Sequence, residues 1–398
     1  MGEVTPLRVL IVGAGSAGLL AAHCLGAENI EYVVFEKDAD LKQRPRDWNF
    51  GIYWAQSRLD ECLPPALKER IQSVQTDPAH VPDPNGVMPV YNAETGELMK
   101  DLPAPFSRRL QRKKWIDLLG TGIDIRRGKV LHKIQEDGNT VTAIFTDGTQ
   151  ETGDLLIGAE GAHSLTREYL VGKEEAQLIP SEVVASFSLT KLDKEISLSL
   201  RNVHPRYCVL FHPNGTFAFY SVHDATSDDP AQWTWLLTQS WRSSESSHLQ
   251  GPAIVTDMKE RASLFASPFR EAFQAIPEGA PSWHNRLSNW PTKPWDNRGG
   301  KITLIGDAAH PMTFHRGQGL QNAITDAVSL LQHVREMKAP TREALAGAVK
   351  NYEKELWPRG NEAVLASEDN TNMVHDWESM LRSPLFVGGM VRNVTEGS

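Results

Sequence analysis

The chain of 398 residues contains only three cysteines, Cys24, Cys62 and Cys208. So few and so unevenly spaced thiols do not indicate a disulfide framework, and none of them has the spacing of metal ligands. We therefore expect a reducing, cytoplasmic location and no metal site.

Long apolar runs and an excess of positive charge are also lacking. No stretch approaches the ~20 apolar residues that a membrane-spanning helix needs. The net charge of −9 argues against a nucleic-acid partner held by general electrostatics. The length allows two domains around a large core. We expect a monomer or homodimer that acts on a small molecule.

The segment from residue 7 to residue 37 predicts a strand, a tight turn, a helix and a second strand. Its turn carries G-x-G-x-x-G as Gly13, Gly15 and Gly18, with Ser16 and Ala17 inside it. Gly13 permits the sharp turn, Gly15 lets the backbone approach a pyrophosphate, and Gly18 lets the helix pack closely. The free N–H groups of the helix start would face the phosphates. The pattern predicts a dinucleotide site, and a turn used for packing alone is the alternative.

Glu36 ends the second predicted strand, where a carboxylate accepts hydrogen bonds from a ribose. A negative charge at this position would repel a 2′-phosphate, so FAD or NAD is favoured over NADP. Lys37 follows directly, and Arg46 lies in the polar stretch beyond it. Arg46 is a candidate phosphate ligand, and an exposed loop arginine is the alternative.

The predicted secondary structure changes several times along the rest of the chain. Breakers between residues 76 and 87 indicate a crossing between domains. Residues 108–119 predict a helix, and residues 128–159 predict a strand meander whose last strand covers 154–157. Alternating apolar and polar residues over 183–241 indicate an antiparallel sheet. Helices are predicted over 258–275 and over 342–357, the second one ending at Pro358.

Three motifs stand in order along the chain. They are the glycine fingerprint, then Asp154-Leu-Leu-Ile-Gly-Ala-Glu-Gly-Ala-His-Ser164 with Arg167, then Gly306-Asp-Ala-Ala-His-Pro311 before Gly317-Gln-Gly-Leu-Gln-Asn322. Over roughly residues 7–357 the chain resembles the single-component FAD-dependent aromatic hydroxylases. That class includes the para-hydroxybenzoate, salicylate and kynurenine hydroxylases. The overall style is similar to fungal secondary-metabolite monooxygenases.

The resemblance implies an α/β fold, with a Rossmann-like FAD-binding domain and an inserted antiparallel-sheet substrate domain. The FAD-binding domain would comprise residues 1–77, 100–180 and 287–358. The sheet domain would comprise residues 78–99 and 181–286, and residues 359–398 would form a C-terminal segment.

The resemblance also assigns cofactor contacts. Asp307 would bind the ribityl chain of FAD. Glu160 and Gly161 would lie near the pyrophosphate and influence NAD(P)H binding, although the family usually has Asp where this chain has Glu160. Arg112 would contact FAD, with Arg108 and Arg109 as competing candidates. Further contacts are expected from the loop and helix start after the third motif, at Pro311, Gly317, Gln318, Gly319 and Leu320. The N–H groups of that helix start can stabilise negative charge on reduced flavin.

The implied reaction is monooxygenation. NADPH or NADH would reduce FAD, O2 would add to give a flavin 4a-hydroperoxide, and its distal oxygen would hydroxylate or epoxidise a substrate. A bulky, electron-rich aromatic, polyketide, terpenoid or indole compound would suit. The sequence leaves open which nicotinamide nucleotide donates the hydride.

Four polar residues are catalytic candidates: Arg206, Tyr220, His310 and His315. A histidine or tyrosine accepting a phenol proton would raise electron density on the ring. A satisfied core or surface role is the alternative for each of them, and no third ligand supports a metal at the two histidines.

Three other functions compete with this one. Baeyer–Villiger oxygenation by the same single dinucleotide domain stays possible, as does a flavoprotein that only binds FAD or a partner. Halogenation is disfavoured because Trp233-Thr-Trp235 lacks the isoleucine and proline of the halogenase signature W-x-W-x-I-P.

Overall fold

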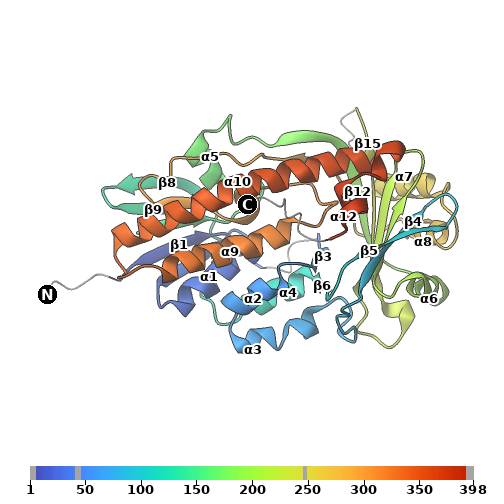
Figure 1. The fold of residues 1–398 in the computed structure, drawn as a ribbon, viewed down its shortest axis with the longest axis horizontal. Coiled ribbons are helices and arrows are strands. Elements are labelled where there is room, and N and C mark those ends of the chain that lie inside the picture. The colour runs from blue at the N-terminus through green and yellow to red at the C-terminus, as the bar shows by residue number, and fades with distance from the viewer. Residues whose placement is uncertain (1–5, 41–45, 245–248, 391–398) are drawn as a thin grey trace.

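A five-stranded parallel sheet forms the centre of one half of the molecule (Figure 1). The computed structural model describes residues 6–40, 46–244 and 249–390. In the sheet order β17-β11-β1-β2-β7, the strands are β17 (Ile302–Leu304), β11 (Leu155–Gly158), β1 (Arg8–Val12), β2 (Glu31–Glu36) and β7 (Ile125–Arg127). The strands β1, β11 and β17 are almost wholly buried because a parallel sheet is covered on both faces. We call this half the parallel-sheet region.

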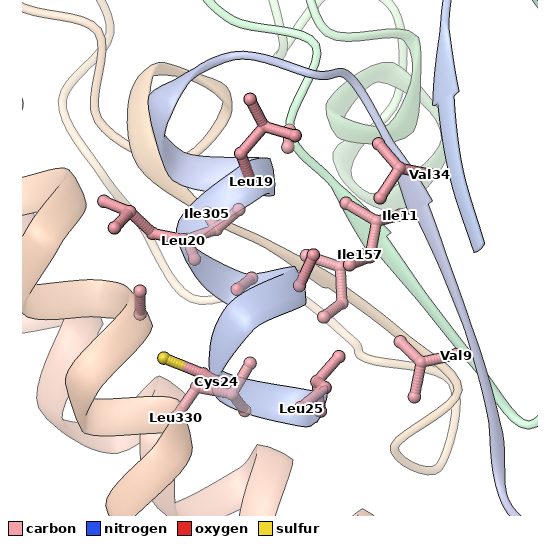
Figure 2. Close-up of a cluster of buried hydrophobic side chains, with 14 of the residues drawn as sticks. Val9, Ile11, Leu19, Leu20, Cys24, Leu25, Val34, Ile157, Ile305 and Leu330 are labelled. Carbon is pink, nitrogen blue, oxygen red and sulfur yellow. The ribbon is translucent and has the colours of Figure 1, made fainter. Parts of the chain in front are cut away.

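Helix α1 (Ser16–Ala27) begins after Gly15 and packs on the parallel sheet. Figure 2 shows side chains of α1 meeting those of the strands, of Ile305 and of helix α9 (Gly319–Arg335). The labelled side chains are Val9, Ile11, Leu19, Leu20, Cys24, Leu25, Val34, Ile157, Ile305 and Leu330. Each fully buried leucine contributes about 1.5–3 kcal/mol, so this core fixes where the glycine turn lies.

The second face of the parallel sheet is covered by a three-stranded antiparallel sheet. Its strands are β8 (Leu131–Asp137), β9 (Thr140–Phe145) and β10 (Gln150–Gly153). The prediction that the strand near residues 154–157 belongs to this meander is wrong. Strand β11 pairs in parallel with β1 and β17 instead, because its apolar residues Leu155, Leu156 and Ile157 are buried on both faces.

A seven-stranded sheet forms the other half, which we call the large-sheet region (Figure 1). In the sheet order, the strands are β16 (Ser282–Asn289), β12 (Ile179–Lys191), β15 (Thr234–Arg242), β14 (Phe217–Asp224), β13 (Tyr207–Phe211), β4 (Val87–Asn92) and β5 (Leu98–Pro103). All neighbours are antiparallel except β13 and β4, which are parallel. The antiparallel sheet indicated by residues 183–241 is therefore present, and the one parallel pair involves β4, which lies outside that range.

The two faces of the large sheet have different neighbours. Ala218 and Tyr220 of β14 join a core with helices α6 (Lys194–Val203), α7 (Pro252–Ala262) and α8 (Phe269–Gln274). Phe217 and Phe219, the alternate residues, join a cluster that includes Tyr53 of the parallel-sheet region. Side chains alternate between faces along a strand, so the second face is the one directed at the parallel-sheet region.

Two helix predictions need correction at their boundaries. Residues 108–111 form strand β6 (Arg108–Gln111), which pairs with β3 (Asn49–Ile52), and only then does α4 (Arg112–Leu119) begin. The helix predicted over 258–275 is divided into α7 and α8. Pro268 stands directly before α8, and a proline at such a position cannot continue a preceding helix.

Helix α10 (Arg342–Val374) also corrects a prediction, since it does not end at Pro358. A proline inside a helix removes one hydrogen bond. Burial of Val364, Ser367 and Thr371 beyond it stabilises the continued helix. Glu368 then accepts hydrogen bonds from Ser181 and Asn289 of the large-sheet region. Figure 1 shows α10 extending along both halves of the molecule.

The remaining short elements connect these layers. They are α2 (Gln56–Cys62), α3 (Pro65–Lys68), α5 (Leu165–Val171), α11 (Trp377–Met380) and α12 (Pro384–Gly388), with 3-10 turns η2 (Ile71–Val74), η3 (Pro230–Gln232) and η4 (Gly306–Ala308). Among the helices of the described ranges, none is long and apolar enough to cross a membrane.

Candidate active site

The glycine turn between β1 and α1 separates two kinds of glycine. A Cβ added to Gly13 would lie 2.2 Å from the carbonyl oxygen of Ala159, and one on Gly18 would lie 2.1 Å from that of Gly13. Those two glycines are required by the protein itself. Gly15 differs, because a Cβ there would have no protein atom within 4 Å. The space beside Gly15 therefore fits the close backbone approach of a pyrophosphate.

Glu36 lies beside this turn at the end of β2. Its Oε2 accepts a hydrogen bond from the Ala14 N–H at 2.9 Å, and its Oε1 accepts one from the Asp38 N–H. The carboxylate is thus held where the sequence places a ribose ligand. Lys37 and Arg46 are both exposed. Their contacts with a cofactor stay predictions.

Ser16 and Ala17 tie the turn to its surroundings. The Ser16 Oγ accepts a hydrogen bond from Trp115 Nε1 of α4. The Ala17 Cβ contacts the third motif, because a Cβ added to Gly306 would lie 2.7 Å from it. Gly306 has φ +63°, a left-handed conformation that favours glycine. The first and third motifs are therefore in contact across the start of α1.

Asp307, in turn η4, can be reached by solvent. The protein around it nevertheless removes part of the water from its carboxyl group, and this desolvation raises the pKa of that group. Nearby Asp326 adds to this rise. A Cβ on Gly319, the first residue of α9, would lie 3.7 Å from Asp307 Oδ1. No hydrogen bond to Asp307 occurs within the described residues. Its accessible carboxylate at a helix start suits the hydroxyl groups of a ribityl chain.

His310 lies behind Asp307 and is completely buried. Its Nε2 donates a hydrogen bond to Asp326 Oδ2 at 2.7 Å, and the same oxygen accepts one from the Gly306 N–H. The catalytic role considered for His310 therefore has no support from its position. His310 is a positioning residue that fixes the turn carrying Asp307.

The second motif is held mainly by its own side chains. Glu160 accepts hydrogen bonds from the Ser164 Oγ, the Thr166 Oγ1 and the Thr166 N–H. Its carboxylate thus caps the start of α5. Gly161 follows with φ +84°, and a Cβ there would meet no protein atom within 4 Å. A direct contact of Glu160 or Gly161 with a cofactor stays a prediction.

Arg167 joins the second motif to the third. Its guanidinium is buried and donates to the carbonyl oxygens of Ala162, Ala176 and Ala308. It also lies over the ring of Trp290, 5.1 Å from the ring centre. Because Ala308 is adjacent to Asp307, this arginine helps to position the turn that carries Asp307.

Arg112 is the first residue of α4. Its guanidinium lies 4.7 Å from the ring centre of Trp48. This places Arg112 at the junction of α4 with the stretch that contains Arg46. Arg108 donates to Gln56, whereas Arg109 points into the interior beside Tyr207 and Phe219.

The loop from Pro311 to Leu320 approaches the large sheet and then enters α9. Gln318 Oε1 accepts a hydrogen bond from Trp54 Nε1, and its Nε2 donates to the Arg316 carbonyl. Gly317 has φ +60°, and a Cβ there would lie 2.8 Å from Met390 Cε. Gly319 and Leu320 are the first residues of α9 and are half-buried. The backbone N–H groups of this helix start are therefore available to a ligand.

The structure separates the remaining catalytic candidates. Tyr220 lies on the helix-covered face of the large sheet and donates to the Leu200 carbonyl, so it is remote from the face directed at Asp307. His315 is buried between Ser240 and Thr371. Burial and nearby His375 lower the pKa of His315 far below its ordinary value, so His315 is neutral. Arg206 is buried at the start of β13.

Several residues of this region were not singled out from the sequence. Asn49, Tyr53 and Asp326 surround the candidate site through contacts between distant segments. Arg109 was considered only as an alternative flavin contact. Within the described ranges no group of three or more metal-binding side chains lies together.

Comparison with known proteins agrees with this geometry. The FAD-binding-domain family model matches residues 117–367. The chain is 49% identical to the FAD-dependent monooxygenase cctM of Talaromyces islandicus, with 96% of each chain covered. It is 32% identical to the FAD-dependent monooxygenase phnB of Penicillium herquei, covering 96% of this chain and 95% of that one.

Two solved structures have the same fold. Klebsiella pneumoniae HpxO, complexed with FAD and uric acid, has a TM-score of 0.77 at 18% identity, covering 96% of this chain and 92% of that one. The 2,6-dihydroxypyridine-3-hydroxylase of Arthrobacter nicotinovorans has a TM-score of 0.73 at 16% identity, with 94% of each chain covered. The space beside Gly15, the accessible Asp307 carboxylate and the helix starts fit FAD. The chain therefore belongs to the FAD-binding-domain family and is an FAD-dependent monooxygenase.

Proposed function

We propose that the protein uses NADH or NADPH and O2 to hydroxylate or epoxidise a bulky, electron-rich aromatic, polyketide, terpenoid or indole compound in secondary metabolism of the fungal type. The observation that carries the proposal is the position of Asp307. Its accessible carboxylate stands at the start of α9, and the loop that leads into this helix carries Phe314, which meets the aromatic face of the large sheet. The monooxygenase names of the fungal relatives add support.

The residues that would hold FAD lie on three segments. Gly15 and the start of α1 would bind the pyrophosphate through backbone N–H groups, with Glu36 at the adenosine ribose. Asp307 would accept hydrogen bonds from the ribityl hydroxyls. Bound FAD would supply electron transfer from the nicotinamide nucleotide and activation of O2.

The start of α9 would act on the charge of the reduced cofactor. Its first N–H groups and the positive end of its dipole favour negative charge in front of Gly319 and Leu320. Glycines at 317 and 319 allow a flat ring to come close to the backbone. This gives the helix a chemical role besides its packing against α1.

Aromatic side chains would shield the reacting atoms from water. Phe187 and Phe217 of the large sheet both lie near Phe314 of the flavin-side loop. His315 stacks on Phe314, with ring centres 4.2 Å apart. A neutral histidine in this position is a packing group with two hydrogen bonds. Exclusion of water strengthens every electrostatic contact inside such a site.

The test uses the FAD-loaded enzyme with NADH or NADPH and a panel of electron-rich aromatics: 2,4-dihydroxybenzoate, 1,3-dihydroxynaphthalene and indole-3-acetate. We expect at least one compound to speed nucleotide oxidation and to gain one oxygen atom from 18O2, measured by mass spectrometry. A lactone product would redirect the reaction to Baeyer–Villiger oxygenation. An enzyme whose flavin neither nucleotide reduces across the panel would contradict the proposal.

A further inference from the structure

Two buried arginines meet at one tyrosine ring between the two halves of the molecule. Arg109 lies on β6 and Arg206 directly precedes β13, and they are 8% and 3% exposed. The guanidinium carbon of Arg109 lies 5.6 Å from the ring centre of Tyr207, and that of Arg206 lies 4.8 Å from it. The Arg109 guanidinium also lies 4.8 Å from the ring centre of Phe219.

The hydrogen-bond acceptors of this pair are neutral. Arg206 donates to the carbonyl and hydroxyl oxygens of Ser107 and to the Tyr207 hydroxyl. Arg109 donates to the side-chain and main-chain oxygens of Asn49. The Arg206 Nε is buried without an acceptor. Within the part of the chain that the structure describes, neither guanidinium has a carboxylate within ion-pair distance.

The neighbouring phenols do not supply the missing negative charge. Burial raises the pKa of Tyr53, which hydrogen-bonds Arg109, to about 12. Tyr53 is therefore a neutral partner at physiological pH. Asp47 is connected to Arg109 only through Asn49 and His223, and its Oδ2 already contacts His223 Nε2 at 3.3 Å.

Two other buried arginines, Arg359 and Arg167, have more complete partners than Arg109 and Arg206. Arg359 contacts the carboxylates of Asp326 and Glu355. Arg167 has no ion-pair partner among the described residues, yet its Nε and both terminal nitrogens donate to carbonyl oxygens. An uncompensated buried charge is strongly destabilising, so two adjacent cations with neutral partners form a site prepared for an anion.

The position of the pair indicates which anion reaches it. Gln111 shares the face of β6 with Arg109 and lines a cleft of about 460 Å³ between the two halves, together with His223 and Thr234. Phe219 belongs to the aromatic cluster that also contains Phe314 of the loop before α9. The pair thus lies between an opening and the aromatic face.

We infer that Arg109, supported by Arg206, binds an anionic group of the substrate, a carboxylate or an ionised phenol or enol of an aromatic or polyketide compound. The inference rests on the proposed function, which leaves the charge of the substrate open. Bidentate contact with a planar anion is the geometry that a guanidinium favours. The anion would fix one end of the substrate while its ring lies against Phe219.

The test compares 2,4-dihydroxybenzoate with 2,4-dihydroxybenzamide, which have similar shapes and differ in charge. Binding to the FAD-loaded enzyme is followed by the change in visible flavin absorbance. We expect the wild type to bind the benzoate at least ~10-fold more tightly than the amide. Arg109→Met should remove this preference by weakening benzoate binding much more than amide binding, with Arg109→Lys intermediate. Arg261→Gln is the matched control, because Arg261 lies over Trp241 but is paired with Asp257.

Three results of the binding experiment would overturn the inference. One is a wild type with no preference for the benzoate, including one that binds neither probe at millimolar concentration. Another is a preference that survives in Arg109→Met. The third is loss of FAD from Arg109→Met while Arg261→Gln stays loaded, since the anion would then belong to the cofactor. If Arg109→Met fails to fold, Arg109→Lys supplies the comparison, because its preference for the benzoate should be smaller than that of the wild type. Oxygenation of neutral compounds alone would refute the inference and leave the proposed function intact.

Discussion

Two aspartates, Asp326 within α9 and Asp307 near the start of that helix, occupy opposite environments. Asp326 is fully buried and accepts hydrogen bonds from the Gly306 N–H, His310 and Arg359. His310 and Arg359 lower the pKa of Asp326 to about 2 despite its burial. Asp307 is reached by solvent, has no hydrogen bond within the described chain, and its pKa is raised. The described chain supplies hydrogen-bond donors to Asp326, whereas Asp307 is left with its acceptor oxygens available to a ligand.

The arginines repeat this contrast. Arg359 is neutralised by two carboxylates of the chain, whereas the partners of Arg109 among the described residues are all neutral. In both pairs the group with charged partners holds the fold, and the other group has no oppositely charged partner within ion-pair distance among the described residues. For Asp307 and Arg109, the lack of an oppositely charged partner within the described chain therefore marks a candidate binding residue, whereas Glu36, the expected ribose ligand, is already held by two backbone N–H groups.

The largest expected effect comes from Gly15→Val. Gly15 has φ −80° and ψ −178°, an extended conformation that valine adopts, and a Cβ there meets no protein atom. We expect a folded protein that retains no FAD, because the side chain fills the place of the pyrophosphate. The flavin absorbance of the purified protein measures this. Gly18→Val is the contrasting variant, since its Cβ would clash with the Gly13 carbonyl and should impair folding. A yellow, fully loaded Gly15→Val protein would refute the dinucleotide site.

Asp326→Asn should lower the free energy of unfolding by about 3 kcal/mol, because Arg359 and the Gly306 turn lose a charged acceptor. Urea denaturation measures the change. Glu182→Gln, which removes an exposed ion pair with Arg242, is the matched control and should change stability by less than ~1 kcal/mol. Equal effects of the two variants would contradict the contrast between complete and incomplete partners.

Asp307→Ala should leave stability nearly unchanged and weaken FAD binding. The loss of a charged acceptor is typically worth ~1.5–3 kcal/mol, which corresponds to roughly a 10- to 150-fold higher Kd for FAD. Titration of the apoprotein with FAD, followed by fluorescence quenching, gives this number. Asp307→Asn keeps an acceptor without the charge, so its Kd for FAD should lie between those of the wild type and Asp307→Ala. Unchanged affinity in both variants would remove Asp307 from the site.

The pH dependence of stability should have opposite signs at the two aspartates. The pKa of Asp326 is depressed in the fold, so its stabilisation is present above pH ~4 and is lost as pH falls toward 2. The stability difference between wild type and Asp326→Asn should shrink by roughly 2 kcal/mol over that interval. The pKa of Asp307 is raised, so ionised Asp307 slightly disfavours the folded apoprotein. Asp307→Asn should therefore be neutral or slightly stabilising at pH 7 and should lose that advantage in acid.

Local motifs made the nucleotide-binding part of the fold predictable. Gly13, Gly18 and Glu36 act within one strand–turn–helix–strand unit, so their spacing alone fixes their geometry. The apolar run around Leu156 predicted a strand, but its partners depend on burial of both faces, which the run itself does not reveal. Pro358 misled the prediction because the loss of one hydrogen bond was weighed without the burial of Val364 and Ser367 beyond it.

The arginine pair was beyond the reach of sequence patterns. Arg109 and Arg206 are separated by almost a hundred positions and meet because β6 lies beside the face of β13 and β14 that carries Tyr207 and Phe219. No spacing rule marks a charge as unpaired, since that property depends on every neighbour. Tyr220 was predicted to be catalytic because a tyrosine can accept a phenol proton. The sequence did not reveal that it lies on the helix-covered face of the large sheet.

Helix α10 links the two halves of the molecule. Near the middle of the helix, Arg359 donates a hydrogen bond to Asp326, which also holds the Gly306 turn. Toward the end of the helix, Glu368 accepts hydrogen bonds from Ser181 and Asn289 of the large-sheet region. Because one helix is fastened at both places, we expect the two halves to resist opening about a hinge. The same helix makes the halves mechanically interdependent, and heat should melt them in one cooperative step.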